Sequence, residues 1–193
     1  MILFFDTETA GLPRDWKAPY TDTSNWPRMV QLAWLVYSPQ GQQLSGGNLI
    51  VRPDGFTIPA EASNIHRITT ERALTEGVAL HEVMTQFAQA LNNCSHVVAH
   101  NINFDKNVVG AEFIRAGINH LLFNKQHICT MQKTTNYCAL PGNWGYKWPT
   151  LSELHYKLFN EYFEEAHDGF IDVSATARCF WELQKKNFFG ILN

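Results

Sequence analysis

Residues 2–9 read ILFFDTET, and the apolar part, residues 2–6, predicts a buried central strand. Side chains i and i+2 of a strand point to the same face, so Asp6 and Glu8 project together from its end. Two carboxylates held close together repel each other, and a cation between them relieves that repulsion. Mg²⁺ and Mn²⁺ prefer such oxygen ligands. A water-exposed strand end without a metal is the alternative that these residues leave open.

The segments that follow predict that this strand opens an antiparallel meander. Residues 12–28 are rich in Pro, Asp, Ser and Asn, which indicates a loop. Residues 29–38 have the composition of a strand, and the sequence PQGQQ that follows suits a hairpin turn. Residues 43–52 then continue as a third strand, so we expect three neighbouring antiparallel strands.

The rest of the chain alternates between helical and strand-like patterns. Helices are expected over residues 60–76 (one or two short ones), 79–93, 104–117, 150–159 and 172–189, strands over 96–100 and 127–130, and a loop over 141–149. Gly117 is a favoured C-cap residue, and Thr150 with Glu153 forms a capping box. This order predicts a mixed α/β fold, in which helices flank a five-stranded sheet in a single domain over residues 1–193.

Composition narrows the class of protein. The chain has 193 residues, 45% of them hydrophobic, and a net charge of −3, which argues against disorder and against a strongly basic coat protein for nucleic acid. No run of 18 apolar residues predicts a membrane span, and the N-terminus lacks the basic region of a signal peptide. The scattered cysteines have no zinc-site spacing, so we expect reduced thiols and a cytoplasmic protein; they are Cys94, Cys129, Cys138 and Cys179.

Two further acidic positions belong with the first pair. Asp105 follows the strand at 96–100, near the start of the next helix, where the helix dipole favours an anion. Asp172 opens the last helix, and His167 stands five residues before it in a loop. The unperturbed pKa of histidine is near neutral, which suits a general base beside a metal-binding acid. Taken singly, each of these residues also fits a structural or surface role.

Taken together, the motifs resemble those of a known family. They are FFDTETAGLP (4–13), NIHRIT (64–69), VVAHNINFDKNVV (97–109), KWPTLSELHYKLF (147–159) and HDGFID (167–172). In this order they are similar to the DEDDh (DnaQ-like) 3′–5′ exonucleases of RNase H-like fold, which include the DNA polymerase III epsilon type, ribonuclease T and oligoribonuclease. The resemblance covers nearly the whole chain. One departure is Gly169, where relatives often carry Ala, and it could loosen the His167 loop.

The resemblance implies a reaction and a role for each motif residue. The reaction is hydrolysis of the terminal phosphodiester of a single strand, which releases nucleoside 5′-monophosphates with two divalent ions, Mg²⁺ or Mn²⁺, about 3.5–4 Å apart. Asp6 would bridge the two ions, and Glu8 with Asp172 would complete the site that activates water. Asp105 would support the second ion, and His167 would take the proton from the attacking water.

The resemblance also implies contacts with the substrate. The strand's 3′ end would meet Thr7, Thr9, Gly11, Leu12, Glu61, His66, Asn101 and Phe104, with Leu12 as a wedge beside the terminal base. Aromatic residues in the two loops offer stacking surfaces or, equally, ordinary packing; they are Trp16, Tyr20, Trp26, Trp144 and Trp148. DNA proofreading, with a DNA polymerase as a candidate partner, is the favoured setting, and trimming of RNA on the same site is the alternative.

Two other readings compete with an exonuclease. A haloacid-dehalogenase-type phosphatase also places an acidic pair after its first strand, but it leaves the N-terminal meander and the HNINFD segment (100–105) unexplained. The other alternative is a non-catalytic module that binds nucleic acid or a polymerase. A protein that only binds, however, gains nothing from clustered negative charge facing phosphates.

Overall fold

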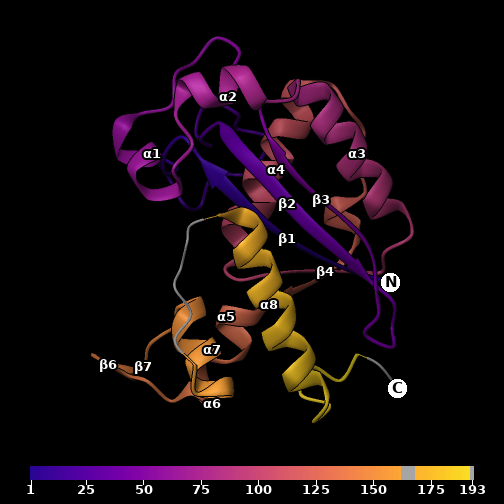
Figure 1. The fold of residues 1–193 in the computed structure, drawn as a ribbon. Helices are drawn as coiled ribbons and strands as arrows, with labels where there is room; N and C mark the ends of the chain where they lie inside the picture. The colour runs from indigo at the N-terminus through magenta and orange to yellow at the C-terminus, as the bar shows by residue number, and fades with distance from the viewer. Residues whose placement is uncertain (162–167, 192–193) are drawn as a thin grey trace.

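A computed structural model describes residues 1–161 and 168–191, and its centre is a five-stranded sheet (Figure 1). The strands are β1 (Ile2–Thr9), β2 (Met29–Tyr37), β3 (Gln43–Ile50), β4 (His96–Ala99) and β5 (Gln126–Cys129), in the order β3-β2-β1-β4-β5. The first three form an antiparallel meander, and β4 and β5 run parallel to β1. The predicted mixed sheet is therefore confirmed.

Helices connect and cover these strands. They are α1 (Ala60–His66), α2 (Thr70–Glu76), α3 (Leu80–Asn92), α4 (Ile102–Ala116), η1 (Leu122–Asn124), α5 (Thr130–Lys133), α6 (Thr135–Cys138), α7 (Leu151–Phe159) and α8 (Gly169–Gln184). A small hairpin, β6 (Pro141–Gly142) and β7 (Gly145–Tyr146), lies between α6 and α7. The capping box of Thr150 and Glu153 begins α7, and Gly117, at φ 67°, ends α4, as the sequence predicts.

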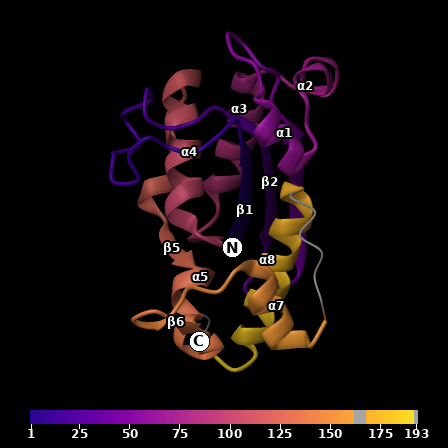
Figure 2. The ribbon, with the colours of Figure 1, turned by 90° about the vertical axis from the view of Figure 1, so that its left-hand side faces the viewer.

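Strand β1 divides its side chains between two layers of helices. Leu3 and Phe5 pack in the cluster formed with α3 and α4, whereas Ile2 and Phe4 pack beneath α8. This alternation is the period of two of a strand that is covered on both faces. Figure 2 shows the sheet between these layers, with α4 on one side and α8 on the other. Every second residue of β1 is thereby directed toward α8.

Strand β1 is also longer than its parallel neighbour. It pairs with β4 only through Ile2–Phe4, because β4 ends at Ala99, whereas its pairing with β2 continues to Thr9. The register with β2 shifts between Glu8 and Thr9, which marks a bulge at this end. The last residues of β1 thus protrude beyond the parallel part of the sheet.

Several predicted boundaries were wrong. The first strand reaches Thr9 rather than residue 6, because polar residues at a protruding strand end still pair with β2. The helix expected at 104–117 begins at Ile102, and the one expected at 172–189 spans Gly169–Gln184. Asp168 accepts a hydrogen bond from the Phe170 N–H at 2.9 Å and so begins α8 before Asp172. The expected loop 141–149 contains the small hairpin.

A buried ion cluster fixes the long loop 12–28 to the sheet. Glu112 of α4 is fully buried and accepts hydrogen bonds from the Met29 N–H at 2.9 Å and from Arg28 Nε at 3.0 Å. Arg115 lies 2.8 Å from the same carboxylate and donates to the carbonyls of Thr23 and Trp26. This cluster therefore holds the end of the loop where β2 begins.

The four cysteines are free thiols and all are buried, so the expected absence of disulfides agrees with the structure. Burial raises the pKa of Cys94 and Cys138, and raises that of Cys179 to about 12. Within the described residues, no helix combines the length and the apolar character needed to cross a membrane.

We expect Glu112→Ala to lower the free energy of unfolding by about 3 kcal/mol, because it leaves two partly buried arginines without their carboxylate. Urea unfolding measures the change. The matched control is Glu76→Ala, which breaks the exposed pair with Arg72 and should cost less than about 0.5 kcal/mol. Equal losses for the two variants would contradict a special role of the buried cluster.

Candidate metal centre and active site

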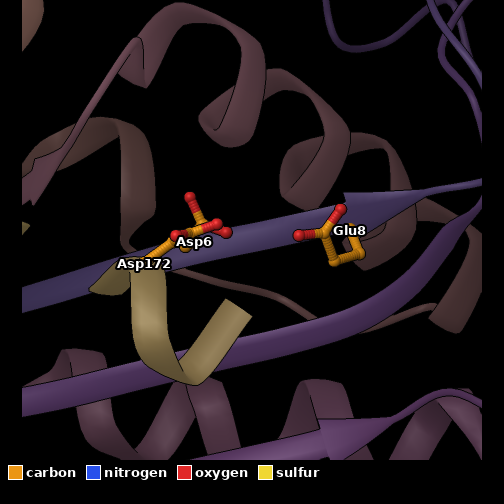
Figure 3. Close-up of side chains that lie close together, drawn as sticks. All are labelled: Asp6, Glu8 and Asp172. Atoms are coloured by element: carbon orange, nitrogen blue, oxygen red, sulfur yellow. The ribbon is translucent and has the colours of Figure 1, made fainter. Parts of the chain in front are cut away.

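Three carboxylates meet at the protruding end of β1. Asp6 and Glu8 continue the row of side chains beneath α8, and Asp172 approaches from the first turn of α8 (Figure 3). One carboxylate oxygen from each lies within 4.8 Å of the others. Asp6 and Glu8 are half-buried, and Asp172 is 9% exposed. Three oxygen donors converging on one point fit a hard divalent cation.

Asp105, the fourth predicted acid, reaches the site from the opposite face of β1. It lies in the first turn of α4 and is 3% exposed. Its Oδ1 accepts hydrogen bonds from the Thr7 N–H at 3.1 Å and from Thr7 Oγ1 at 2.8 Å. Because β4 stops short of Thr7, the Asp105 carboxylate takes the place of a strand partner there. Asp105 therefore lies beside the other three acids without joining their convergence point.

The electrostatics of these acids reflect crowding and burial. Loss of solvation and the charges of Asp105 and Glu8 raise the pKa of Asp6 well above its ordinary value. Burial, followed by the charge of Asp172, raises the pKa of Glu8 to about 8. Burial also raises the pKa of Asp105 to about 7, although the hydrogen bonds from Thr7 oppose this rise. Asp6, Glu8 and Asp105 would lose their protons readily only with a cation present beside them.

The start of α8 is held against the sheet by Gln31. The Gly169 N–H donates to Gln31 Oε1 at 3.1 Å, and Gln31 Nε2 donates to Asn48 Oδ1 at 2.7 Å. A Cβ on Gly169 would lie 3.3 Å from Gln31 Oε1 and 3.6 Å from Asp6 Oδ2. A larger residue at this position would therefore require a shift of a few tenths of an ångström by the Gln31 side chain. The effect of Gly169 on the His167 loop stays a prediction, because His167 lies outside the described residues.

A pocket of about 550 Å³ adjoins the acids between the end of β1 and α1. Its lining is mainly apolar and includes Glu8, Pro59, Ala62 and Ile65. The predicted substrate residues that it brings together are Thr7, Thr9, Gly11, Leu12, Glu61, His66 and Phe104, whereas Asn101 is not among its walls. A cavity of this size is typical of sites for small ligands.

The residues predicted to contact the substrate differ in their exposure and in the hydrogen bonds that they already make within the protein. The Thr7 N–H and hydroxyl donate to Asp105, and Thr9 Oγ1 donates to the Gly11 carbonyl at 2.7 Å. His66 is 4% exposed, and its Nδ1 accepts from the Ile68 N–H at the end of α1. Leu12, by contrast, is 71% exposed at the rim of the pocket. Asn101 precedes α4 in a left-handed conformation, at φ 73°.

The remaining sequence candidates are His167 and the loop aromatics. His167 lies outside the described residues. Trp26 is buried, Tyr20 stacks on Phe123 with ring centroids 4.0 Å apart, and Trp16 lies against Phe104 at 5.7 Å. In the loop 12–28, Trp26 and Tyr20 therefore have a packing role, whereas Trp16 is 55% exposed and the stacking alternative stays open for it. Trp144 and Trp148, from the second aromatic loop, are exposed.

The parts of the site that support the acids were not predicted from the sequence. Gln31, which anchors α8, is the polar exception in the apolar strand MVQLAWLVY and faces Glu8 across the sheet, so that pattern offered a signal. The charge of Asp168 raises the pKa of both Asp6 and Glu8. In the sequence this residue stood out only as part of the motif HDGFID (167–172). Ile65 gave no signal, since its exposure on α1 depends on how that short helix docks.

Comparison with known proteins assigns the family. The model of the RNase_T family, described as exonuclease, matches residues 3–180. The chain belongs to this exonuclease family. Membership in this family implies dependence on divalent metal ions, and an acidic cluster is present in this chain. It also removes the phosphatase alternative. No curated protein matches the sequence.

The fold is similar to that of solved exonuclease I structures. The zinc-bound complex of Escherichia coli exonuclease I with single-stranded DNA is 19% identical, with a TM-score of 0.75. The Escherichia coli enzyme with a dA16 oligonucleotide and the Methylocaldum szegediense enzyme are each 18% identical, with a TM-score of 0.76. In all three, 98% of this chain is covered but only 42% of the other chain. The chain therefore spans less than half of these exonuclease I chains.

The raised pKa values predict how stability changes with pH when no metal is bound. In the unfolded chain these acids ionise near pH 4, whereas in the folded protein Asp105 and Glu8 hold protons up to pH values of about 7 and about 8. The folded state then binds more protons, so the free energy of unfolding falls as pH rises across this range. We expect the melting temperature in EDTA to be lower at about pH 8 than at about pH 6.

Asp6→Asn is the matched variant for this measurement. Because it removes one of the repelling charges, it should flatten the fall in melting temperature in EDTA. Added Mg²⁺ or Mn²⁺ should stabilise the unmodified protein more at the higher pH, and it should stabilise Asp6→Asn much less. A wild-type melting temperature in EDTA with the same pH slope as the variant would show that these acids are not the cause.

Proposed function

We propose that this protein is a metal-dependent 3′–5′ exonuclease that removes nucleoside 5′-monophosphates from single-stranded DNA. The observation that carries this proposal is the position of Glu8, which belongs both to the carboxylate cluster and to the wall of the pocket. A terminal nucleotide seated in the pocket would therefore place its phosphate at the acids. Family membership supports this choice, as do the similar structures of exonuclease I in complex with single-stranded DNA or a dA16 oligonucleotide.

The residues present fit divalent cations, Mg²⁺ or Mn²⁺, as the cofactor. The donors are all carboxylate oxygens, and burial together with their mutual repulsion raises the pKa of Asp6 and Glu8, which a divalent cation would counteract. Asp6, Glu8 and Asp172 would hold a first ion, and Asp6 with Asp105 would hold a second. Such ions neutralise charge on the phosphate and make water a stronger nucleophile at neutral pH.

The protein's own groups bind and orient the strand end. Leu12 and Ile65, both exposed at the pocket, offer apolar contact to the terminal base. The two hydrogen bonds from Thr7, both to Oδ1, hold the Asp105 carboxylate in one orientation. Gln31 holds the start of α8 against the sheet, and this positions Asp172 relative to Asp6.

His167 is the proposed general base, which accepts the proton of the attacking water. It stands five residues before Asp172 in the sequence, and the start of α8 is anchored one residue after Asp168. The epsilon-type resemblance implies this role. Proofreading with a DNA polymerase, a single functional domain over residues 1–193, and a cytoplasmic location stay predictions of the same resemblance. Trimming of RNA is the alternative substrate choice.

We expect Asp172→Asn to abolish release of mononucleotides while leaving the fold intact, because it removes a ligand charge without changing side-chain size. The assay follows single-stranded DNA labelled at the 5′ end, on which a 3′–5′ enzyme leaves a ladder of shortened products. Glu76→Gln, at a side chain on α2 that is 54% exposed, is the control and should retain activity. Normal turnover by Asp172→Asn would disprove the metal assignment, and matched RNA substrates decide between DNA and RNA.

His167→Gln should lower the turnover number by about 10²–10⁴-fold, the usual contribution of a general base. The pH–rate profile separates this role from a structural one. In the unmodified enzyme the rate should rise with pH as the imidazole loses its proton, and in the variant this limb should disappear. An ascending limb that persists unchanged in His167→Gln would rule out this residue as the base.

A further inference from the structure

The small hairpin between α6 and α7 presents an aromatic side chain at its tip. Its strands pair Pro141 with Tyr146 and Gly142 with Gly145, so Asn143 and Trp144 form a two-residue turn. Gly145 adopts φ 121°, a conformation that favours glycine, and a Cβ on Gly142 would lie 2.9 Å from the Gly145 carbonyl oxygen. These glycines fix a tight turn, and the Trp144 side chain at its tip is completely exposed.

Two more aromatic residues follow at alternate positions. Tyr146 is 56% exposed and Trp148 is 59% exposed. We refer to residues 141–148 as the aromatic hairpin. Three exposed rings within five residues are costly in water unless they bind something, because large exposed apolar groups normally pack. In the other aromatic loop Trp26 is buried and Trp16 is 55% exposed, so the hairpin differs from it in having all three of its rings exposed.

The segment that carries the aromatic hairpin is basic although the protein is acidic. Residues 125–160 contain four lysines and one glutamate, a net charge of +3 with neutral histidines, so the rest of the chain carries −6. Lys147 lies in the hairpin, where it forms an ion pair with Glu153, and Lys157 lies on α7. The remaining excess of positive charge in this segment, together with exposed rings, favours a polyanion that also has aromatic groups, which is the chemistry of single-stranded nucleic acid.

The aromatic hairpin is connected through His100 to the end of β4. His100 follows β4 and donates from Nε2 to the Pro149 carbonyl at 3.0 Å. Asp105 lies only five residues further along, in the first turn of α4. In Figures 1 and 2 the hairpin lies at the lower end of the molecule, beside α5, α6 and α7, whereas β1 ends in the upper part near α1. Only a strand several nucleotides long could reach from the acids to the hairpin.

We propose that the aromatic hairpin is a second binding site for the DNA strand, at which unpaired bases upstream of the 3′ end stack on Trp144 and Trp148. This inference rests on the proposed exonuclease function and extends it: long single strands are bound at two places, and short ones only at the pocket. The flexible backbone of a single strand spans the interval between the two, whereas a base-paired region there could not offer its bases to the rings.

The test compares substrates of different length. For the unmodified enzyme in Mg²⁺, kcat/KM should be higher on a dT10 oligonucleotide than on dT2, because only the longer strand reaches the aromatic hairpin. Trp144→Ala and Trp148→Ala should each lower kcat/KM on dT10 by roughly 5- to 100-fold, the range for loss of one base–aromatic stack. Their values on dT2 should equal that of the unmodified enzyme.

Two further variants separate stacking from other causes. Trp144→Phe keeps a ring and should retain most of the preference for dT10, whereas Trp144→Leu is apolar without a ring and should behave like the alanine variant. Leu44→Ala, at a side chain 49% exposed on β3, is the control for loss of an exposed apolar group and should change neither substrate. Circular dichroism verifies that each variant folds.

Binding without turnover gives an independent measurement. With Ca²⁺ in place of Mg²⁺, the Kd for dT10 labelled with fluorescein at the 5′ end should rise in Trp144→Ala by the same factor as kcat/KM falls. Unchanged Kd and unchanged kcat/KM on dT10 in both tryptophan variants would overturn the inference and would instead favour a protein contact at this surface. If the unmodified enzyme hydrolyses neither oligonucleotide, the proposed function fails, while the Kd comparison still decides whether the aromatic hairpin binds single strands.

Discussion

The candidate site depends on one constraint, namely that β1 is covered by helices on both faces. A side chain on such a strand has no route to solvent except at the strand's end, so its alternation decides which layer each residue meets. Ile2 and Phe4 stabilise the layer beneath α8, and the same alternation commits Asp6 and Glu8 to that layer. The hydrophobic core and the acidic cluster are therefore two parts of one row of side chains. The packing of Ile2 and Phe4 stabilises the strand and thereby offsets the repulsion between Asp6 and Glu8.

The length difference between β1 and β4 explains how a fourth acid is brought in. Were β4 as long as β1, the Thr7 N–H would donate to a strand carbonyl, and α4 would begin too far along to meet the site. Because β4 ends at Ala99, α4 begins beside β1 and Asp105 accepts both donors of Thr7. A backbone group that would otherwise lack a partner thus fixes the orientation of a carboxylate. Residues on opposite faces of β1 can act together only around this open edge.

The sequence predicted the sheet and the acids because both follow from short, local patterns. The alternation in β1, the strand composition of 29–38 and the capping box at Thr150 are signals within a few residues. The misplaced start of α8 came from reading Asp172 as the first helical residue, when Asp168 caps the helix four residues earlier. The roles of Gln31 and Thr7 could not be read, since each depends on the partner that the fold places opposite. The sequence also could not predict that Trp144 is exposed and Trp26 buried, because both stand in polar loops rich in proline or glycine.

The buried cysteines give the protein a chemical property of their own. Reaction with electrophiles and oxidants proceeds through the thiolate, and burial with a raised pKa suppresses that form at Cys94, Cys138 and Cys179. In the folded state these positions are therefore inert, and modification proceeds only through opening of the surrounding structure. Cys94 lies between α3 and β4 in the cluster with α3 and α4, whereas Cys179 of α8 packs in the cluster with α6 and α7. The alkylation rate of Cys94 would therefore report opening of the layer of α3 and α4, and that of Cys179 would report separation of α8 from α6 and α7.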